Sequence, residues 1–179
     1  MILSEQDVKA ILARFNLGSL AELQEYCVLD LMLQKQMEIS EVLALSLDDL
    51  PAIQEDGAIS KKLKLLLGKW VQKRPTDSGK LFCALNMDQE LSEYSMAEAL
   101  EQAALRAGVT KKVDLYTWYL YGLNALDANK SSGQAIKVDS KSHQKEKQQD
   151  RMESLYRRWK EIVDHRRGSG NSKENSSKQ

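Results

Sequence analysis

Proline and glycine are scarce in this chain of 179 residues, which has two prolines and nine glycines. Both residue types interrupt helices, and their scarcity beside abundant Leu, Ala, Glu, Gln and Lys predicts an all-α protein. Hydrophobic residues make up 42% of the chain, which is enough for a core. A chain of this length holds one domain of ordinary size or two small ones with a tail.

Cysteine and histidine are equally rare, with two of each. Cys27 and Cys83 lie in apolar sequence without a CxxC pair, so we expect buried thiols rather than a disulfide or a metal site. His143 and His165 both lie in the polar C-terminal part. So few ligands argue against a zinc site, and we expect no cofactor.

Motifs for catalysis and for membrane insertion are also missing. The sequence has no Walker motif, GxGxxG, HExxH, or Ser-His-Asp or Cys-His constellation. The carboxylate pair Glu55 and Asp56 is expected in a turn, without an apolar pocket to raise its pKa. No apolar run approaches the roughly 20 residues that span a bilayer. We therefore expect an intracellular protein that is not an enzyme and does not insert into a membrane.

Charge is unevenly distributed along the chain although the formal net charge is zero. Residues 1–60 carry three basic and eleven acidic side chains, whereas residues 61–80 carry seven basic and one acidic. Residues 81–127 are again acidic, with three bases against seven acids, and residues 128–179 carry thirteen bases against seven acids. Contact with a polyanion is therefore expected on residues 61–80 or in the C-terminal part.

The stretch 95–126 is the most informative part of the sequence, because it predicts two helices joined by a tight turn. Ser95 and Glu98 form a capping box that begins the first helix. Gly108 is expected to end that helix, and Thr110 to cap the next one. Helical spacing gives the second helix one apolar face, made by Val113, Tyr116, Leu120 and Leu123.

This pattern is the outline of a helix-turn-helix, in which a small residue such as Ala104 lets the two helices approach closely. An ordinary helical hairpin within a bundle has the same pattern. The sequence leaves both alternatives open.

Residues 1–74 are predicted to form an acidic N-terminal helical domain. Ser4, the pair Ser19 and Glu22, and Ser60 are expected to begin three of its helices. Apolar spacing and caps place the helices at 4–16, 19–34, 38–45 and 60–72, with a turn or short helix at 48–53. The last helix is amphipathic, with leucines and Trp70 on one face and lysines largely on the other.

The rest of the chain is predicted to form a second domain and a tail. Residues 75–80 have linker composition and are the expected domain boundary. A second helical domain is expected at 81–127, beginning with a helix at 81–91, and is followed by a flexible linker at 128–141. A basic amphipathic helix is expected at 142–167, with a disordered end at 168–179.

Two segments of the sequence carry a resemblance to known families. The segment EVLALSLDDLPAIQEDGAISKKLKLLLGKW (41–70) is similar to the second half of a POU-specific or lambda-repressor-like domain. The segment LYTWYL (115–120) resembles the third-helix core of a homeodomain, with Trp118 at the invariant tryptophan and Tyr119 at the adjacent aromatic position. The resemblance implies a POU-like domain, a basic linker and a degenerate homeodomain-like domain, which is the architecture of a transcription factor.

The positions that read DNA in these families differ here. Homeodomains follow the aromatic pair with an adenine-reading Asn and two arginines, whereas this sequence has Tyr121, Gly122 and Leu123. None of these three side chains makes the bidentate contact to adenine. The expected reading helix of the first domain, residues 48–56, carries four acidic side chains that a phosphate backbone would repel. These departures count against direct base readout by the two helices.

Basic residues are the candidates for nucleic-acid binding, on the closing helix of the first domain, at the start of the last helix of the second, and on the C-terminal helix. They are Lys61, Lys62, Lys64, Lys69, Lys73, Arg74, Lys111, Lys112, Arg157, Arg158, Arg166 and Arg167. Ordinary solvated helix faces are the alternative explanation for each group.

Aromatic residues are the candidates for contact with a protein partner, because Tyr and Trp bring contact area at low cost in entropy. Four aromatic residues within six positions cannot all face one core, so at least one is expected to project outward. The candidates are Tyr116, Trp118, Tyr119, Tyr121 and Trp159.

The leading hypothesis from the sequence is a transcription-regulatory or chromatin-associated protein of the nucleus. It would resemble helix-turn-helix proteins and would contact nucleic acid through basic patches within a larger complex. The alternative is a protein-interaction adaptor without direct DNA binding, which uses its acidic half and its aromatic helix. Protein partners are expected under both hypotheses, and the C-terminal helix is a candidate for homo-oligomerisation.

Overall fold

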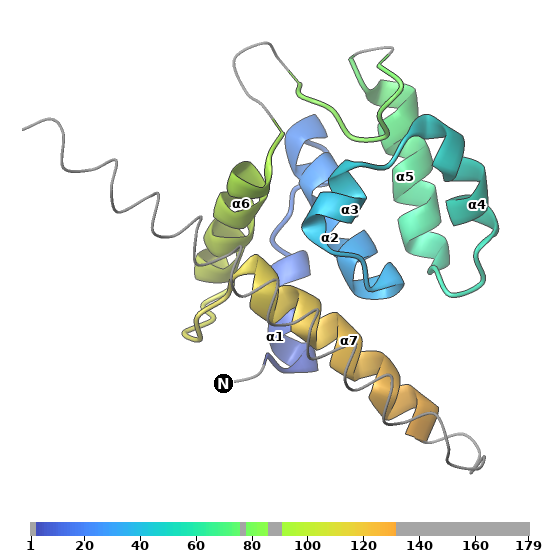
Figure 1. Cartoon of the computed structure of the whole chain (residues 1–179). Coiled ribbons are helices and arrows are strands. Elements are labelled where there is room, and N and C mark those ends of the chain that lie inside the picture. Colours follow the sequence, from blue (N-terminus) through green and yellow to red (C-terminus); the bar gives the residue numbers. More distant parts are fainter. Residues whose placement is uncertain (1–2, 76–77, 86–90, 132–179) are drawn as a thin grey trace, which may run out of the picture. The chain divides into compact units, whose positions relative to one another are not determined.

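The computed structural model describes residues 3–75, 78–85 and 91–131. These residues contain seven α-helices and one 3-10 helix, and they contain no strand, so the prediction of an all-α protein is confirmed (Figure 1). The elements are α1 (Glu5–Leu12), α2 (Leu20–Lys35), α3 (Ile39–Leu43), η1 (Leu47–Asp49), α4 (Leu50–Glu55), α5 (Lys61–Lys73), α6 (Glu93–Arg106) and α7 (Leu115–Ser131). The C-terminal helix predicted at 142–167 and the tail lie outside the described residues.

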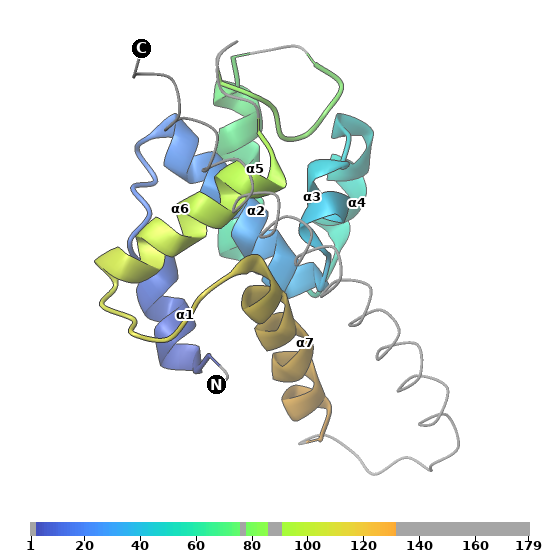
Figure 2. The ribbon, with the colours of Figure 1, turned by 60° about the vertical axis from the view of Figure 1, so that its left-hand side comes forward.

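Helix α2 is the centre of the fold, and α3, α5, α6 and α7 all contact it. Figure 1 shows α2 between α5 and α6, and in Figure 2 helix α6 runs across α2. Consecutive buried residues from Tyr26 to Met32 mean that this part of α2 is enclosed on every side. The buried residues of α2 are Leu23, Gln24, Tyr26, Cys27, Val28, Leu29, Asp30, Leu31 and Met32.

The boundary expected at 75–80 does not separate two cores, because residues 1–132 form one compact unit. Trp70 on α5 donates its indole N–H to the carbonyl of Leu81 at 2.9 Å. The N–H of Cys83 donates to the buried side chain of Gln24 on α2 at 2.9 Å. The two predicted domains therefore share α2 as a common core.

The helix expected at 81–91 is absent from residues 81–85, which are irregular. The N–H of Leu81 donates to the carbonyl of Leu45 at 2.8 Å instead of to a helical neighbour. Leu81, Phe82 and Cys83 are all buried. These apolar residues belong to a buried connecting segment. A short apolar run without clear periodicity looks the same in sequence whether it forms a buried connection or a buried helix.

Two of the predicted helix starts in the N-terminal part are confirmed by their side-chain caps. The hydroxyl of Ser4 accepts from the N–H of Asp7 at 3.2 Å, and the Asp7 carboxylate accepts the N–H of Ser4 at 2.8 Å. Ser60 caps α5 by accepting the N–H of Leu63 at 3.2 Å. The leucine face of α5 is buried against α2, and its lysine-bearing face is exposed, as its amphipathic pattern predicts.

Gly108 ends α6 as predicted, with a φ of +71°. Its N–H donates to the carbonyl of Leu105 at 3.0 Å, and the next N–H, of Val109, donates to the carbonyl of Ala104 at 3.1 Å. This pair of bonds is a Schellman motif, which requires the left-handed conformation that glycine adopts without strain. The end of α6 is therefore a property of the local sequence.

The starts of α6 and α7 differ from the prediction. Helix α6 begins three residues earlier than expected, because Ser92 and Ser95 cap each other reciprocally and Ser95 does not pair with Glu98. Helix α7 is capped by Asp114, whose carboxylate accepts the N–H of Thr117 at 2.8 Å, and not by Thr110. Residues 107–114 thus connect the helices, a longer connection than the three or four residues typical of a helix-turn-helix.

The buried face of α7 is not the predicted one. Trp118 and Tyr119 are buried, and Gly122 lies against Leu33 of α2. Of the four residues expected to form the apolar face, Val113 is buried but lies before α7 begins, and Tyr116, Leu120 and Leu123 are partly exposed. Helix α7 also continues to Ser131, so residues 128–131 of the predicted flexible linker are helical.

Candidate functional site

Two of the basic residues predicted to bind nucleic acid bond to the backbone of the fold. The Nζ of Lys69 donates to the carbonyl of Leu17 at 2.8 Å. The guanidinium of Arg74 donates to the carbonyls of Ser78 at 2.6 Å and Lys80 at 2.5 Å. Both side chains therefore hold connecting segments against α5.

Two further candidates, Lys111 and Lys112, pair with carboxylates. The Nζ of Lys111 lies 2.6 Å from the Asp7 carboxylate at the start of α1. The hydrogen bond from Lys111 is the main reason that the pKa of Asp7 is lowered to about 2, with the Ser4 cap adding to it. Lys112 lies 3.7 Å from Asp114, the residue that caps α7. The positive charges of Lys111 and Lys112, which were expected to bind phosphate, are therefore paired with carboxylates of the protein itself.

The remaining candidates that the structure describes lie on α5. Lys61, Lys62 and Lys73 are exposed, and Lys64 is partly exposed. The Nζ of Lys62 lies 4.8 Å from the centre of the Tyr26 ring, in a cation–π contact. The four arginines of the C-terminal segment, Arg157, Arg158, Arg166 and Arg167, lie outside the described residues.

The aromatic candidates divide between core and surface. Trp118 has no exposed area, and its indole N–H donates to the carbonyl of Leu29 at 3.0 Å. Tyr119 is 3% exposed. Both are core residues and not a surface for a partner, and Trp118 lies in the contact between α7 and α2. Tyr116 and Tyr121 are partly exposed, and Trp159 lies outside the described residues.

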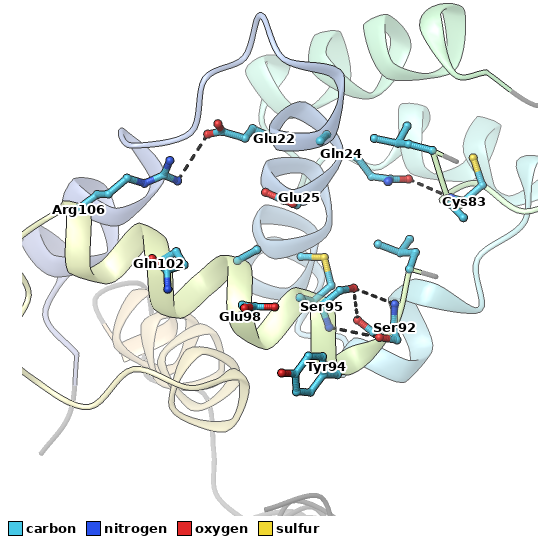
Figure 3. Close-up of a pocket in the computed structure, with 16 residues that line it drawn as sticks. Glu22, Gln24, Glu25, Cys83, Ser92, Tyr94, Ser95, Glu98, Gln102 and Arg106 are labelled. Carbon is cyan, nitrogen blue, oxygen red and sulfur yellow. Dashed lines mark hydrogen bonds and ion pairs between the residues drawn. The ribbon is translucent and has the colours of Figure 1, made fainter. Parts of the chain in front are cut away.

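A cleft of about 640 Å³ lies between the first half of α2 and helix α6, with residues 83–85 and Leu91 along one side (Figure 3). Two glutamates one turn apart on α2, Glu22 and Glu25, line it from one side. Glu98 and Arg106 line it from α6. The cleft therefore carries three carboxylates and one guanidinium.

Arg106 does not neutralise the cleft. Its guanidinium lies 3.5 Å from the Glu22 carboxylate, and its side chain is 47% exposed, which makes a weak surface pair. The capping box expected from Ser19 and Glu22 does not form, because the Ser19 side chain makes no cap hydrogen bond. Glu22 instead accepts the N–H of Asn16 at 2.8 Å. Glu22 thus has partners in the fold.

Glu25 is the unusual group of the cleft. Burial raises its pKa to about 7, and the neighbouring Glu22 adds to the shift while Arg106 opposes it. Among the described residues no cation lies within ion-pairing distance of its carboxylate. A partly buried carboxylate with so little compensation favours the approach of a positive charge.

Gln24 and Cys83 also line the cleft, and the hydrogen bond from the N–H of Cys83 to the Gln24 side chain joins them. The prediction that Cys27 and Cys83 are buried free thiols is confirmed. Burial raises the pKa of Cys83 and raises that of Cys27 to about 12, so both thiols stay protonated at neutral pH.

The regular spacing of polar residues on α2 and α6 is a sequence feature of this cleft, but the spacing alone does not reveal that the two helix faces meet. Glu22 and Glu25 are three residues apart on α2, while Glu98, Gln102 and Arg106 follow one another at intervals of four on α6. Each set lies on one face of its helix. Polar faces of this kind are usually solvated, and only the tertiary contact between α2 and α6 makes them face each other.

No family model, curated protein or solved structure matches this chain. The resemblance to POU-specific and homeodomain-like proteins therefore stays a prediction. Within residues 3–75, 78–85 and 91–131, no helix is long and apolar enough to cross a membrane. In the same part of the chain, no three His, Cys, Asp or Glu residues are grouped so as to hold a metal ion.

Glu25 predicts a pH dependence of stability. Its pKa in the folded state, about 7, exceeds the ordinary value of 4.5 for a glutamate, so the folded protein binds the extra proton. The free energy of unfolding should therefore fall as the pH rises from about 4.5 to about 7. Glu25→Gln removes this titration and should stabilise the protein at about pH 8 by on the order of 1 kcal/mol, after allowance for solvent screening of a partly exposed group.

Urea denaturation of both proteins at several pH values between 5 and 8 measures this effect. Glu98→Gln is the matched control, because Glu98 lines the same cleft but is exposed. Parallel curves of stability against pH for the wild type and Glu25→Gln would show that the carboxyl of Glu25 titrates normally.

Proposed function

We propose that this chain is a protein-interaction adaptor, without enzymatic activity, that binds a basic segment of a partner protein in the cleft between α2 and α6. The observation that carries the proposal is the partly buried carboxylate of Glu25, which has no ion-pairing cation among the described residues. A Lys or Arg side chain from a partner would supply the missing charge. An ion pair formed in such a partly desolvated place is stronger than a pair at the open surface.

The cleft is also lined by large apolar side chains, which favours a partner segment that carries an apolar residue as well. Tyr94, which lines the cleft, is 49% exposed, and Leu85 and Leu91 line the cleft as well. Exposed tyrosines are common at the centres of protein interfaces. We therefore propose a partner segment that combines Lys or Arg with an aliphatic or aromatic side chain.

Direct nucleic-acid binding within a nuclear regulatory complex is our second candidate. Three exposed lysines of α5, Lys61, Lys62 and Lys73, favour it. We rank it second because four of the eight described candidates, Lys69, Arg74, Lys111 and Lys112, bond within the fold.

The proposal can be tested by the fluorescence anisotropy of a labelled dodecapeptide rich in Lys, Arg and Leu. The full chain should bind this peptide, and the double variant Glu25→Gln/Glu98→Gln should bind at least about tenfold more weakly, because two of the three carboxylates of the cleft lose their charge and the third, Glu22, is paired with Arg106. Binding should strengthen from about pH 6 to about pH 8 as Glu25 ionises.

Glu101→Gln is the matched control for the charge change, since Glu101 is exposed on the same helix but does not line the cleft. Circular dichroism establishes that each variant is folded. Equal affinities of the cleft variant and the control, or no binding of the basic peptide at physiological salt, would overturn the proposal.

A further inference from the structure

The outer face of α5 is a second surface, separate from the cleft, with an unusual composition. The helix sequence KKLKLLLGKWVQK contains no acidic residue. Its inner face, Leu63, Leu66, Leu67 and Trp70, is buried. The outer face, defined here as Lys61, Lys62, Leu65, Gly68, Lys69, Gln72 and Lys73, follows from the helical spacing around Leu65.

Leu65 lies at the centre of this outer face and is 74% exposed, more than the other large exposed hydrophobic residues that the structure describes. A single exposed leucine is ordinary by itself. Here, however, Gly68 follows three residues later, and no atom lies within 4 Å of the place where its Cβ would be. Leu65 thus stands beside an open, side-chain-free position on the helix.

The lysines around Leu65 make no ion pair with a carboxylate of the described residues. Lys61 and Lys73 are exposed one turn before and about two turns after Leu65. Lys62 extends over the Tyr26 ring and acts on the buried carboxylate of Asp30, and Lys69 donates to the carbonyl of Leu17. The outer face therefore combines an apolar centre with two exposed lysines, Lys61 and Lys73, that make no ion pair with a described carboxylate.

The surroundings of α5 restrict the kind of anion that fits. Gln54 of α4 donates its side-chain N–H to the carbonyl of Lys64 at 3.0 Å, which places α4 along one side of α5 (Figure 1). The η1–α4 segment carries exposed acidic side chains at Asp48, Asp49 and Glu55. A wide polyanion such as duplex DNA would meet this negative charge, and its phosphates would gain nothing from Leu65. A narrow segment that lies along α5 would stay away from these acidic side chains and could also cover Leu65.

We propose that the outer face of α5 binds an acidic amphipathic segment of a partner protein. The apolar side chains of that segment would cover Leu65 and the open position at Gly68. Its Asp and Glu side chains would pair with Lys61 and Lys73. A short helix that presents apolar anchors at intervals of three and four residues, flanked by acids, has this chemistry.

The test uses the full chain and a labelled peptide of about 15 residues in which Leu recurs at helical spacing among Asp and Glu. The wild type should bind this peptide, and Leu65→Ala should weaken binding about tenfold, since the apolar anchor is lost. Lys61→Gln/Lys73→Gln should weaken it further and reduce its dependence on salt. A scrambled peptide of the same composition should bind less well.

Leu105→Ala is the matched control, because Leu105 is 64% exposed on α6, away from this face. It should leave the affinity for the acidic peptide unchanged. The cleft variant Glu25→Gln/Glu98→Gln should also leave it unchanged, so the proposal for the outer face of α5 and the proposal for the cleft are tested independently. A random 20-base-pair duplex is the competing probe. Tight, steeply salt-dependent binding of the duplex that Leu65→Ala does not alter, without binding of the acidic peptide, would overturn the proposal in favour of nucleic acid. Equal effects of Leu65→Ala and Leu105→Ala would also overturn it.

Discussion

Replacement of Trp118 by alanine is expected to lower the free energy of unfolding by about 3 to 5 kcal/mol. Trp118 has no exposed area and is among the largest fully buried side chains of the described residues. Its removal leaves a cavity between α7 and α2, and it also removes the hydrogen bond from the indole N–H to the carbonyl of Leu29. A loss of this size is a large part of the total stability of a small domain.

Chemical denaturation followed by circular dichroism measures the loss. Trp118→Phe keeps most of the ring and should cost less than half as much as Trp118→Ala. Tyr94→Ala is the control for removal of an aromatic side chain at the surface, because Tyr94 is 49% exposed. A loss below about 1 kcal/mol for Trp118→Ala would show that α7 does not pack on α2 as described.

Gly122→Ala and Gly68→Ala are expected to change stability in opposite directions. A Cβ at Gly122 would lie 3.1 Å from the Cα and 3.2 Å from the carbonyl oxygen of Leu33, and backbone atoms of α2 cannot move aside cheaply. We expect Gly122→Ala to cost about 1 to 3 kcal/mol. A Cβ at Gly68 meets nothing within 4 Å, so Gly68→Ala should stabilise the protein by up to about 1 kcal/mol through helix propensity.

The pair is a sharp test because the chemical change is the same in both variants, and both glycines lie within helices. Denaturation midpoints that move in opposite directions would support the close contact between α7 and α2. A stabilising Gly122→Ala would contradict it. The carbonyl of Gly122 also accepts a hydrogen bond from the Gln36 side chain at 3.3 Å, so this contact joins regions predicted as separate domains.

The contact at Gly122 also gives a physical reason for one departure from the homeodomain pattern. The sequence Tyr121, Gly122 and Leu123 follows the aromatic pair where homeodomains carry DNA-reading side chains. In this fold that part of α7 faces α2 through Gly122, and a large polar side chain there would collide with Leu33. The departure is therefore explained by packing, independently of any nucleic acid.

The amino-acid sequence by itself determined the helical class and those boundaries that depend on local chemistry. Ser4 and Ser60 cap their helices, and Gly108 ends α6, because these effects involve only neighbouring residues. The buried leucine face of α5 was also predictable, since its polar face is unambiguous.

Only the tertiary structure decided which side of α7 is buried and which charges are paired. Residues 115–126 are apolar around most of the helix, so helical spacing could not choose between the face of Trp118 and that of Leu120. The pair of Lys111 and Asp7 joins residues far apart in the chain, and the pKa of Glu25 is raised mainly by its burial in the folded protein. Long-range contacts of this kind depend on the whole packing arrangement, and no local pattern encodes them.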